Sequence, residues 1–509
     1  MQFFKIFCFL QLVICLHLTA LPQNPSVVIG TAEFIQTPSS LQIQVSDHAV
    51  IDWASFSIAL NETVQIIHSS PHSSLLNRIS GDLPTHIEGF LQSNGEMYFI
   101  NPQGLLIGTE ALIKAASFIA STYPLSNEDF LLKQAGLLFK GDSIAPIIHE
   151  GTIRAQDGIV ALFAHRIGQE GTIFAANTAS LAAAHEILLV PSGDTIMHLR
   201  PQLKGGGIKQ SGQIEAIKIL IQSEGTYSLG ILQSGSLQSP DPTQKESCIL
   251  LKAPNNPLEI KGRLSASTIR LEAERIDILS DSSLSAPEGT IHIATEGGPL
   301  FQNGSISAHE ITLLLQKSTE QPLFQSGILK TDFGGSIHLN TPLCIQEGIL
   351  SAPGGFISIL ASKAYTDLPS SLLSVNHPNA NAGSITLFSD TLVSSGTHQA
   401  IGNSEGGQIH LSGKNVSLLG ATIDASGQTK GGEILIGGDL RGKNPAIPNA
   451  DRTFLNPSTL ITANCQNGPA GRIIIWSTEK TEQLGTIQAT GPQKGFINIS
   501  SAEKVIFKN

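Results

Sequence analysis

The chain has 509 residues, a formal net charge of −11, and only 14% charged and 5% aromatic residues. A negative chain without a cluster of basic and aromatic residues is unsuited to binding nucleic acid or an anionic membrane surface. A disordered chain is also excluded, because 41% hydrophobic residues are enough to bury a core. The 49 glycines, in a sequence rich in Ser, Thr and Ile, are typical of short repeated strands joined by tight turns.

The first predicted element is a secretory signal peptide over residues 1–20. Lys5 is its only charged residue, an apolar run covers residues 6–16, and Thr19-Ala20 precedes a polar stretch that contains proline. An apolar run of this length is too short to span a bilayer comfortably. A buried N-terminal strand or helix is the alternative interpretation.

The rest of the sequence predicts an exported chain with no membrane span, no cofactor and no metal site. No other stretch reaches the roughly 18 apolar residues that a membrane helix needs. Cys248, Cys344 and Cys465 remain after the leader, and their wide spacing predicts neither a disulfide framework nor a zinc site. The histidines do not cluster at metal-binding spacing, since His68 and His72 form only a weak pair.

Two tight turns are predicted within residues 92–105. Asn94-Gly95 suits a two-residue hairpin loop that requires positive φ. The segment Asn101-Pro102-Gln103-Gly104 places Asn, Pro and Gly at the first, second and fourth positions of a type I turn. A short apolar strand lies between the two turns, so this stretch predicts a β-rich, tightly turned region.

The body of the chain repeats with a period of roughly 20 to 25 residues. Gly151-Thr-Ile-Arg-Ala recurs at Gly171, and a second unit, Gly335-Ser-Ile-His-Leu, recurs at Gly355. Alternating apolar positions indicate strands, and such a period indicates stacked units, so we predict an all-β parallel solenoid of about 22 coils and about 100 Å. A β-sandwich would instead place turn signals every 8 to 12 residues. Residues 21–51 are the candidate N-terminal cap.

Several motifs over residues 24–184 resemble the secretion domain of filamentous haemagglutinin-like exoproteins. They are Trp53-x-x-Phe56, the segment Leu76-Asn77-Arg78-Ile79-Ser80-Gly81, and Asn101-Pro102-Gln103-Gly104, which is similar to the family's Asn-Pro-Asn-Gly motif. Gln103 replaces the second Asn, and no copy of the family's Asn-Pro-Asn-Leu motif is found. Residues 431–443 are similar to a block that recurs in the rods of the same proteins.

The resemblance implies a right-handed parallel β-helix with an N-terminal cap and extra-helical hairpins. It also implies three segments: a signal peptide at 1–20, a two-partner secretion domain at 24–240, and a β-helical rod at 241–509. Trp53 and Phe56 are expected in the cap core. Asn77 and Arg78 are expected to be secretion-domain motif residues. Arg78 either binds the transporter or satisfies a buried carbonyl, and we favour the second, structural role. The turn at Asn101, Pro102, Gln103 and Gly104 is expected either to be recognised by a transporter or simply to close a corner.

Function is implied by the same resemblance. Exoproteins of this kind reach the periplasm of a Gram-negative bacterium and leave through a dedicated outer-membrane β-barrel transporter of the Omp85 type, which contains POTRA domains. Most members act as adhesins, and some are cytolysins, haem-binding proteins or contact-dependent toxins. They are either secreted or exposed at the cell surface. We therefore expect a secreted or surface-exposed adhesin whose receptor the sequence does not name.

Two alternatives remain. The first is a carbohydrate-active β-helix enzyme, a lyase or hydrolase, which would need paired carboxylates on one exposed face. Glu272, Glu274 and Asp277 lie in one run with Arg270 and Arg275, but this pattern is more typical of a solvated strand face, so we expect no enzyme. No phosphate-loop or His-Glu-x-x-His motif is present either. The second alternative is a secretion-competent remnant without its effector region.

Overall fold

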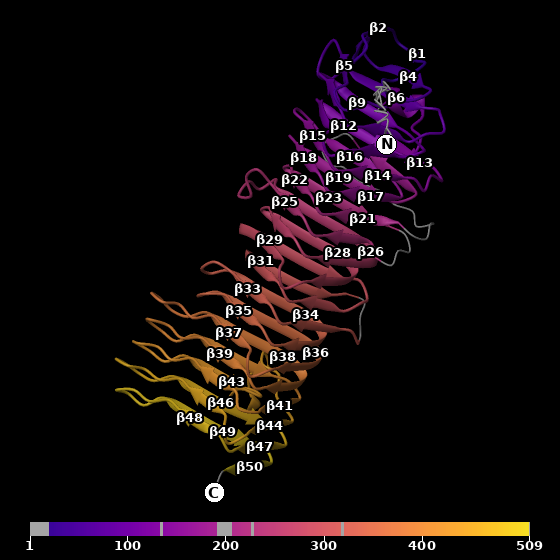
Figure 1. Ribbon diagram of the computed structural model, residues 1–509. Coiled ribbons are helices and arrows are strands. Elements are labelled where there is room, and N and C mark those ends of the chain that lie inside the picture. The colour runs from indigo at the N-terminus through magenta and orange to yellow at the C-terminus, as the bar shows by residue number, and fades with distance from the viewer. Residues whose placement is uncertain (1–19, 133–135, 191–205, 225–228, 317–319, 508–509) are drawn as a thin grey trace, which may run out of the picture.

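The computed structural model describes residues 20–132, 136–190, 206–224, 229–316 and 320–507, so most of the expected signal peptide lies outside the described residues. The described chain is a right-handed parallel β-solenoid in the form of a long rod (Figure 1). The first and the last described strands, β1 (Ser26–Ile29) and β50 (Lys504–Phe507), lie at opposite ends of the rod. No helix in this part of the chain is long and apolar enough to cross a membrane.

Three ladders of parallel strands run along the rod, and each turn contributes one strand or half-strand to each ladder. Ladder 1 has eighteen strands, which gives about 18 turns within the described residues. Its strands are β3 (Ser40–Val45), β5 (Thr63–Ile67), β8 (Phe90–Ser93), β11 (Leu112–Ala115), β15 (Thr152–Ala155), β18 (Thr172–Ala175), β22 (Gln213–Glu215), β25 (Ser236–Gln238), β27 (Arg263–Ser265), β29 (Ser283–Thr295), β31 (Ser305–Leu315), β33 (Ile328–Lys330), β35 (Ile349–Ser351), β37 (Leu372–Ser374), β39 (Thr397–Gln399), β42 (Thr422–Asp424), β45 (Leu460–Thr462) and β48 (Thr486–Gln488).

Ladder 2 follows ladder 1 within most turns. It contains β4 (Ala49–Trp53), β6 (Ser74–Ile79), β9 (Glu96–Ile100), β12 (Ser117–Ser121), β16 (Val160–Phe163), β19 (Thr178–Ala183), β23 (Lys218–Ser223), β26 (Cys248–Ile260), β28 (Thr268–Ile278), the second halves of β29 and β31, β34 (Ser336–Gln346), β36 (Phe356–Asp367), β38 (Ser384–Ser394), β40 (Gln408–Ser412), β43 (Glu433–Ile436), β46 (Arg472–Ser477) and β49 (Phe496–Ser501).

Ladder 3 closes each turn. It contains β7 (Thr85–Ile87), β10 (Leu105–Ile107), β14 (Pro146–His149), β17 (Arg166–Gln169), β21 (Gly207–Gln210), β24 (Ile231–Gln233), β30 (Leu300–Gln302), β32 (Pro322–Gln325), β41 (Asn415–Leu418), β44 (Arg452–Leu455), β47 (Lys480–Gln483) and β50 (Lys504–Phe507). The ends of β26, β28, β34, β36 and β38 complete it, because these long strands bend from ladder 2 into ladder 3.

The turns are fewer than the 22 expected from the repeat period, because loops leave the coil. Thr152 of β15 pairs with Thr172 of β18, so this turn does have a 20-residue period. Thr422 of β42, however, pairs with Leu460 of β45, because a long loop between them contains the short 3₁₀ helix η1 (Leu440–Gly442). The repeat period therefore matches the length of the turns that have no long loop. Dividing the whole chain by this period gives too many turns.

The core lies inside the rod, where one residue of each strand stacks on its equivalent in the next turn. The middle position of ladder 1 is Ile153, then Ile173 and Ile214, and these side chains are buried. Burying such a column of Ile and Leu side chains supplies the main driving force, about 1.5–3 kcal/mol for each. The strand alternation in the sequence therefore predicted the inward face correctly.

The N-terminal end is capped by antiparallel strands. β1 (Ser26–Ile29) pairs with β4, and β2 (Ala32–Gln36) pairs with β3, both antiparallel. Strands of opposite direction end the parallel stacking at this end of the rod. The cap therefore lies within the predicted residues 21–51, although β3 and β4 already belong to the first turn.

A second hydrophobic core lies outside the coil of the N-terminal turns. The helix α1 (Asn127–Leu132) and the strand pair of β13 (Leu137–Lys140) with β20 (Glu186–Leu189) cover the outer face of ladder 2. We call these three elements the cover. β13 and β20 pair antiparallel although about two turns of chain separate them, so the cover is not a local hairpin.

Candidate functional site

The Trp53 and Asn77 side chains meet inside the first turns. The indole Nε1 of Trp53 donates to Oδ1 of Asn77 at 3.1 Å, and both side chains are buried. Phe56 packs edge-on against Trp53, with ring centroids 5.3 Å apart. An indole N–H inside a core needs such an acceptor, which explains why a polar Asn is placed there. Trp53, Phe56 and Asn77 therefore lie in the core and are inaccessible to a partner.

Arg78 joins the coil to the cover. Its Nε lies 2.7 Å from Oδ1 of Asp52, and its Nη1 donates to Oδ1 of Asn127 at 2.8 Å. Asp52 belongs to β4, and Asn127 is the first residue of α1. The guanidinium fork can hold two partners at once, which a lysine cannot do in the same way.

We expect Arg78→Ala to loosen α1 by about 1 kcal/mol, because both bonds are partly exposed to solvent. Hydrogen exchange of the α1 amides should become faster while the neighbouring amides of β6 keep their rates. Lys140→Ala is the matched control, since Lys140 of β13 also forms an ion pair at the cover, with Glu186 at 3.1 Å. Unchanged exchange in α1 would show that Arg78 does not hold the helix.

The turn at residues 101–104 has one buried and one exposed part. Asn101 is 1% exposed, and its Oδ1 accepts the Gln103 N–H at 2.9 Å while its Nδ2 donates to Oγ1 of Thr85 at 3.0 Å. The Gly104 N–H donates to the Asn101 carbonyl at 3.0 Å, as expected for a β-turn. Gly104 has φ +108, and a Cβ there would lie 2.9 Å from the Pro146 carbonyl oxygen. Asn101 and Gly104 thus shape the turn.

Pro102 and Gln103 are exposed at the tip of this turn, next to two apolar side chains. Leu83 is 72% exposed and its carbonyl accepts from Asn101 Nδ2, while Ile144 is 71% exposed and follows Ser143, which donates to the Pro102 carbonyl at 2.6 Å. We call Leu83, Pro102, Gln103 and Ile144 the turn patch. Its parts come from three separate loops of the chain.

The predicted hairpin at Asn94-Gly95 is wrong. The flanking strands β8 and β9 do not pair with each other, because β8 belongs to ladder 1 and β9 to ladder 2. Asn94 instead fixes a corner of the coil: its Oδ1 accepts the His68 N–H at 2.7 Å and its Nδ2 donates to the His68 carbonyl at 3.0 Å. In a solenoid the same turn-forming residues close corners rather than hairpins.

In the C-terminal part of the rod, narrow loops project from one side in a row (Figure 1). We call them the finger loops, residues 376–383, 401–407, 426–432, 464–471 and 490–495. Backbone bridges such as His377 with Gly402 and Gly402 with Gly427 connect them. Neighbouring loops lie very close together, since a Cβ on Gly427 would lie 2.4 Å from the Gly406 backbone nitrogen of the preceding loop.

The finger loops have two different sides. One side forms a groove of about 400 Å³ lined by ten residues, none of them Asp, Glu, Lys or Arg. On the other side lies a larger hollow of about 640 Å³ with several charged residues, namely Glu405, Lys430, Glu433, Arg472 and Lys494. We call them the neutral groove and the charged groove.

The acidic residues give the enzyme alternative no support. In the charged groove, hydrogen bonds from His410 and Arg472 hold the pKa of Glu433 below its ordinary value. Such a carboxyl group is a poor proton donor at neutral pH. In the run singled out by the sequence, Asp277 pairs with Arg275 at 2.9 Å and Glu272 with Lys252 at 3.4 Å. Among the described residues, no group of three or more His, Cys, Asp or Glu is placed to hold a metal ion.

Sequence reasoning missed two polar features inside the coil. The first is a column of buried glutamines at the end of ladder 3, in which Gln210 Nε2 donates to Gln169 Oε1 at 2.9 Å and to the Gly212 carbonyl at 2.7 Å. A recurring Gln-x-Gly at the period of the coil is the signal that could have found it. The second is a cluster around Asp367 and His398, which are both fully buried.

Part of the chain is similar to known proteins. Residues 36–238 match the family described as TPS secretion domain. A heme/hemopexin-binding protein of Haemophilus influenzae strain Rd is 28% identical over 222 residues, 41% of this chain and 23% of that protein. Another heme/hemopexin-binding protein of Haemophilus influenzae is 35% identical over 106 residues, 20% of this chain and 11% of that protein. The matched stretches span less than a quarter of either relative's length.

Among solved structures, the HMW1 secretion domain from Haemophilus influenzae aligns over 96% of this chain and 100% of that chain, with 22% identity and a TM-score of 0.33. The fold described above defines a parallel β-solenoid with a capped N-terminus. Within that class, residues 36–238 match the TPS secretion domain family, and the chain is similar to two-partner secretion exoproteins.

Proposed function

We propose that the chain is exported by a dedicated outer-membrane β-barrel transporter of the Omp85 type, with POTRA domains, and acts outside the cell as an adhesin. A signal peptide at 1–20 would deliver it to the periplasm of a Gram-negative bacterium. The secretion domain at residues 36–238 is the observation that supports this proposal most strongly. We place the division between a secretion domain at 24–240 and a rod at 241–509 near the point where that match ends.

These cysteines fit such a route, because no disulfide joins Cys248, Cys344 and Cys465 to one another in the structure. A chain without crosslinks can pass through a narrow pore in an extended form. The free energy of stacking turns of a solenoid outside the cell would then oppose its return.

We propose that the turn patch is the surface that the transporter recognises. Leu83 and Ile144 expose apolar side chains beside the polar tip of the turn, and protein partners bind such mixed patches. Trp53, Phe56 and Asn77 support this surface from the core. In this proposal Asn101 and Gly104 give the turn its shape, and Pro102 and Gln103 make the contact.

The patch is tested by secretion of Ile144→Asp and Gln103→Ala chains with the candidate transporter co-expressed. We expect about a tenfold drop in extracellular protein for Ile144→Asp and a smaller one for Gln103→Ala, because a charge in an apolar contact costs more than a lost hydrogen bond. Leu60→Asp is the matched control, since Leu60 is also exposed in the secretion domain.

Folding is checked separately on purified chains by circular dichroism and thermal melting. Normal export of the folded Ile144→Asp chain would exclude the turn patch as the recognition surface. Asn101→Ala has a different expected result, because it removes the buried hydrogen bonds that shape the turn. It should reduce both the melting temperature and export.

A further inference from the structure

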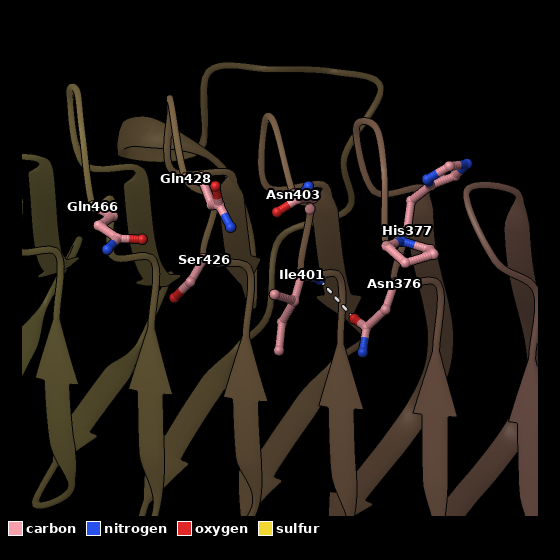
Figure 2. Close-up of a pocket in the computed structure, with 10 residues that line it drawn as sticks. Asn376, His377, Ile401, Asn403, Ser426, Gln428 and Gln466 are labelled. Carbon is pink, nitrogen blue, oxygen red and sulfur yellow. Dashed lines mark hydrogen bonds between the residues drawn. The ribbon is translucent and has the colours of Figure 1, made fainter.

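The neutral groove differs from the rest of the finger-loop surface in what it offers a ligand. Asn403, Gln428 and Gln466 lie at equivalent positions of three successive finger loops, as the backbone bridges of the preceding residues show. Figure 2 shows their side chains in one row along the groove. All three are exposed, and within the described residues their carboxamides have no hydrogen-bond partner.

The floor of the groove is fixed by the loops themselves. Asn376 Oδ1 accepts the Ile401 N–H at 2.7 Å, and Ser426 Oγ accepts the Asn464 N–H at 3.1 Å. Ile401 adds an apolar side chain between these two polar ones (Figure 2). A ligand would therefore meet a preformed surface, which lowers the entropy cost of binding.

An aromatic ring stands at one end of the row. Phe333 is 63% exposed, and its ring centroid lies 5.0 Å from that of His377, which lines the groove. An exposed Phe ring in water is unfavourable, whereas it offers an apolar face to a ligand whose own surface is partly apolar. Free carboxamides and an apolar floor residue thus line the groove, and the Phe333 ring lies beside its end, against His377.

We propose that the neutral groove binds a neutral oligosaccharide. A carboxamide donates and accepts hydrogen bonds, as the hydroxyl groups of a sugar do, and the C–H face of a sugar ring can pack on Phe333. The lining contains no Asp, Glu, Lys or Arg to attract a charged sugar, and the charged groove on the other side of the loops provides a contrast. The row from Asn403 to Gln466 extends over roughly 10 Å, two spacings between strands, which suits a short chain of sugars.

This proposal rests on the proposed function only in that the rod must face the medium, and binding is measured without export. The mature chain, purified in folded form, is applied to an array of neutral hexose and N-acetylhexosamine oligomers. The same array contains sialylated and sulfated forms and random peptides. We expect binding to at least one neutral oligomer and none to its charged forms.

The double variant Asn403→Ala/Gln428→Ala should weaken that binding at least about tenfold, since two hydrogen-bonding groups are removed. Phe333→Ala should weaken it about fivefold. Gln408→Ala is the matched control, because Gln408 is an exposed amide in the charged groove and should leave binding unchanged. Thermal melting confirms that each variant is folded.

Three results would overturn the proposal: no binding to any neutral oligomer, equal binding by the double variant, or binding to peptides or charged sugars instead. A chain that binds the oligomer but is not exported would contradict the proposed function and still support the groove as a binding site. A chain that is exported but does not bind any neutral oligomer would support export and contradict the groove as a binding site.

Discussion

The variant Asp367→Leu is expected to destabilise the turns around it by about 3–5 kcal/mol, because it removes a buried carboxylate and leaves its buried hydrogen-bonding partners unsatisfied. Asp367 and His398 are fully buried, and His398 Nε2 lies 2.8 Å from Asp367 Oδ2. The N–H groups of Ser395 and Gly396 donate to the other carboxylate oxygen at 2.6 and 2.8 Å. Leucine would leave these donors without an acceptor.

The measurement is hydrogen exchange of the amides in β36, β38 and β39, because a solenoid need not unfold in one step. Leu418 occupies the equivalent position two turns further on, so leucine itself fits this column of the coil. The matched control is Asp390→Leu on β38, an exposed carboxylate paired with Lys414 at 2.8 Å, which should cost less than about 1 kcal/mol. Equal effects of the two variants would refute the role of the buried cluster.

The same cluster gives a pH dependence with a definite sign. Burial raises the pKa of Asp367, but the His398 imidazole and the bonds from His398, Gly396 and Ser395 outweigh this and hold the pKa below its ordinary value. A lowered folded-state pKa adds stability above the unfolded value of about 3.9, and that stability is lost as the pH falls through the folded-state pKa. Local exchange near Asp367 should therefore accelerate below about pH 4 in the natural chain, and less so in Asp367→Leu.

The second large effect is expected for Phe130→Ala in the cover. Phe130 is fully buried beneath α1, and its ring centroid lies 5.2 Å from that of Tyr98 on β9. Removing such a ring typically costs about 3–5 kcal/mol. Because the cover packs on the outside of the coil, we expect exchange to become faster in α1, β13 and β20 and to stay unchanged in ladder 1 of the same turns.

Leu131→Ala is the control for this experiment, since Leu131 lies on the same helix and is 42% exposed. It should change exchange by less than a factor of three, given that surface substitutions rarely exceed about 0.5 kcal/mol. If Phe130→Ala loosened the inner ladders as well, the cover and the coil would form one cooperative unit rather than two.

The solenoid could be predicted because its signal repeats. Gly followed by alternating Ile or Leu recurs at the period of one turn, and Ile153 and Ile173 stack in the predicted way. The hairpin at Asn94-Gly95 could not be told from a corner, because both need the same turn-forming residues. The number of turns could not be predicted either, because the repeat period does not account for long loops such as residues 438–450.

The polar interior was missed for a different reason. Asp367 and His398 are 31 residues apart in the sequence. Asp367 stacks on Gln346 of the preceding turn, and His398 stacks on Leu373, so each is an exception in its column. The sequence alone does not show how strands of successive turns pair, and this pairing is what brings the two side chains into contact. The role of Asn101 was likewise open in the sequence, and its burial and hydrogen bonds now place it inside the turn.

The most direct test of the account is export of the natural chain with and without its candidate transporter. The chain is expressed with residues 1–20 included in a Gram-negative host, and full-length protein is quantified in the medium, on the protease-accessible surface and in the periplasm. If the chain is exported by two-partner secretion, extracellular, folded protein is expected only when the transporter is present, and periplasmic retention or degradation when it is absent. Equal extracellular amounts in both strains would contradict two-partner secretion.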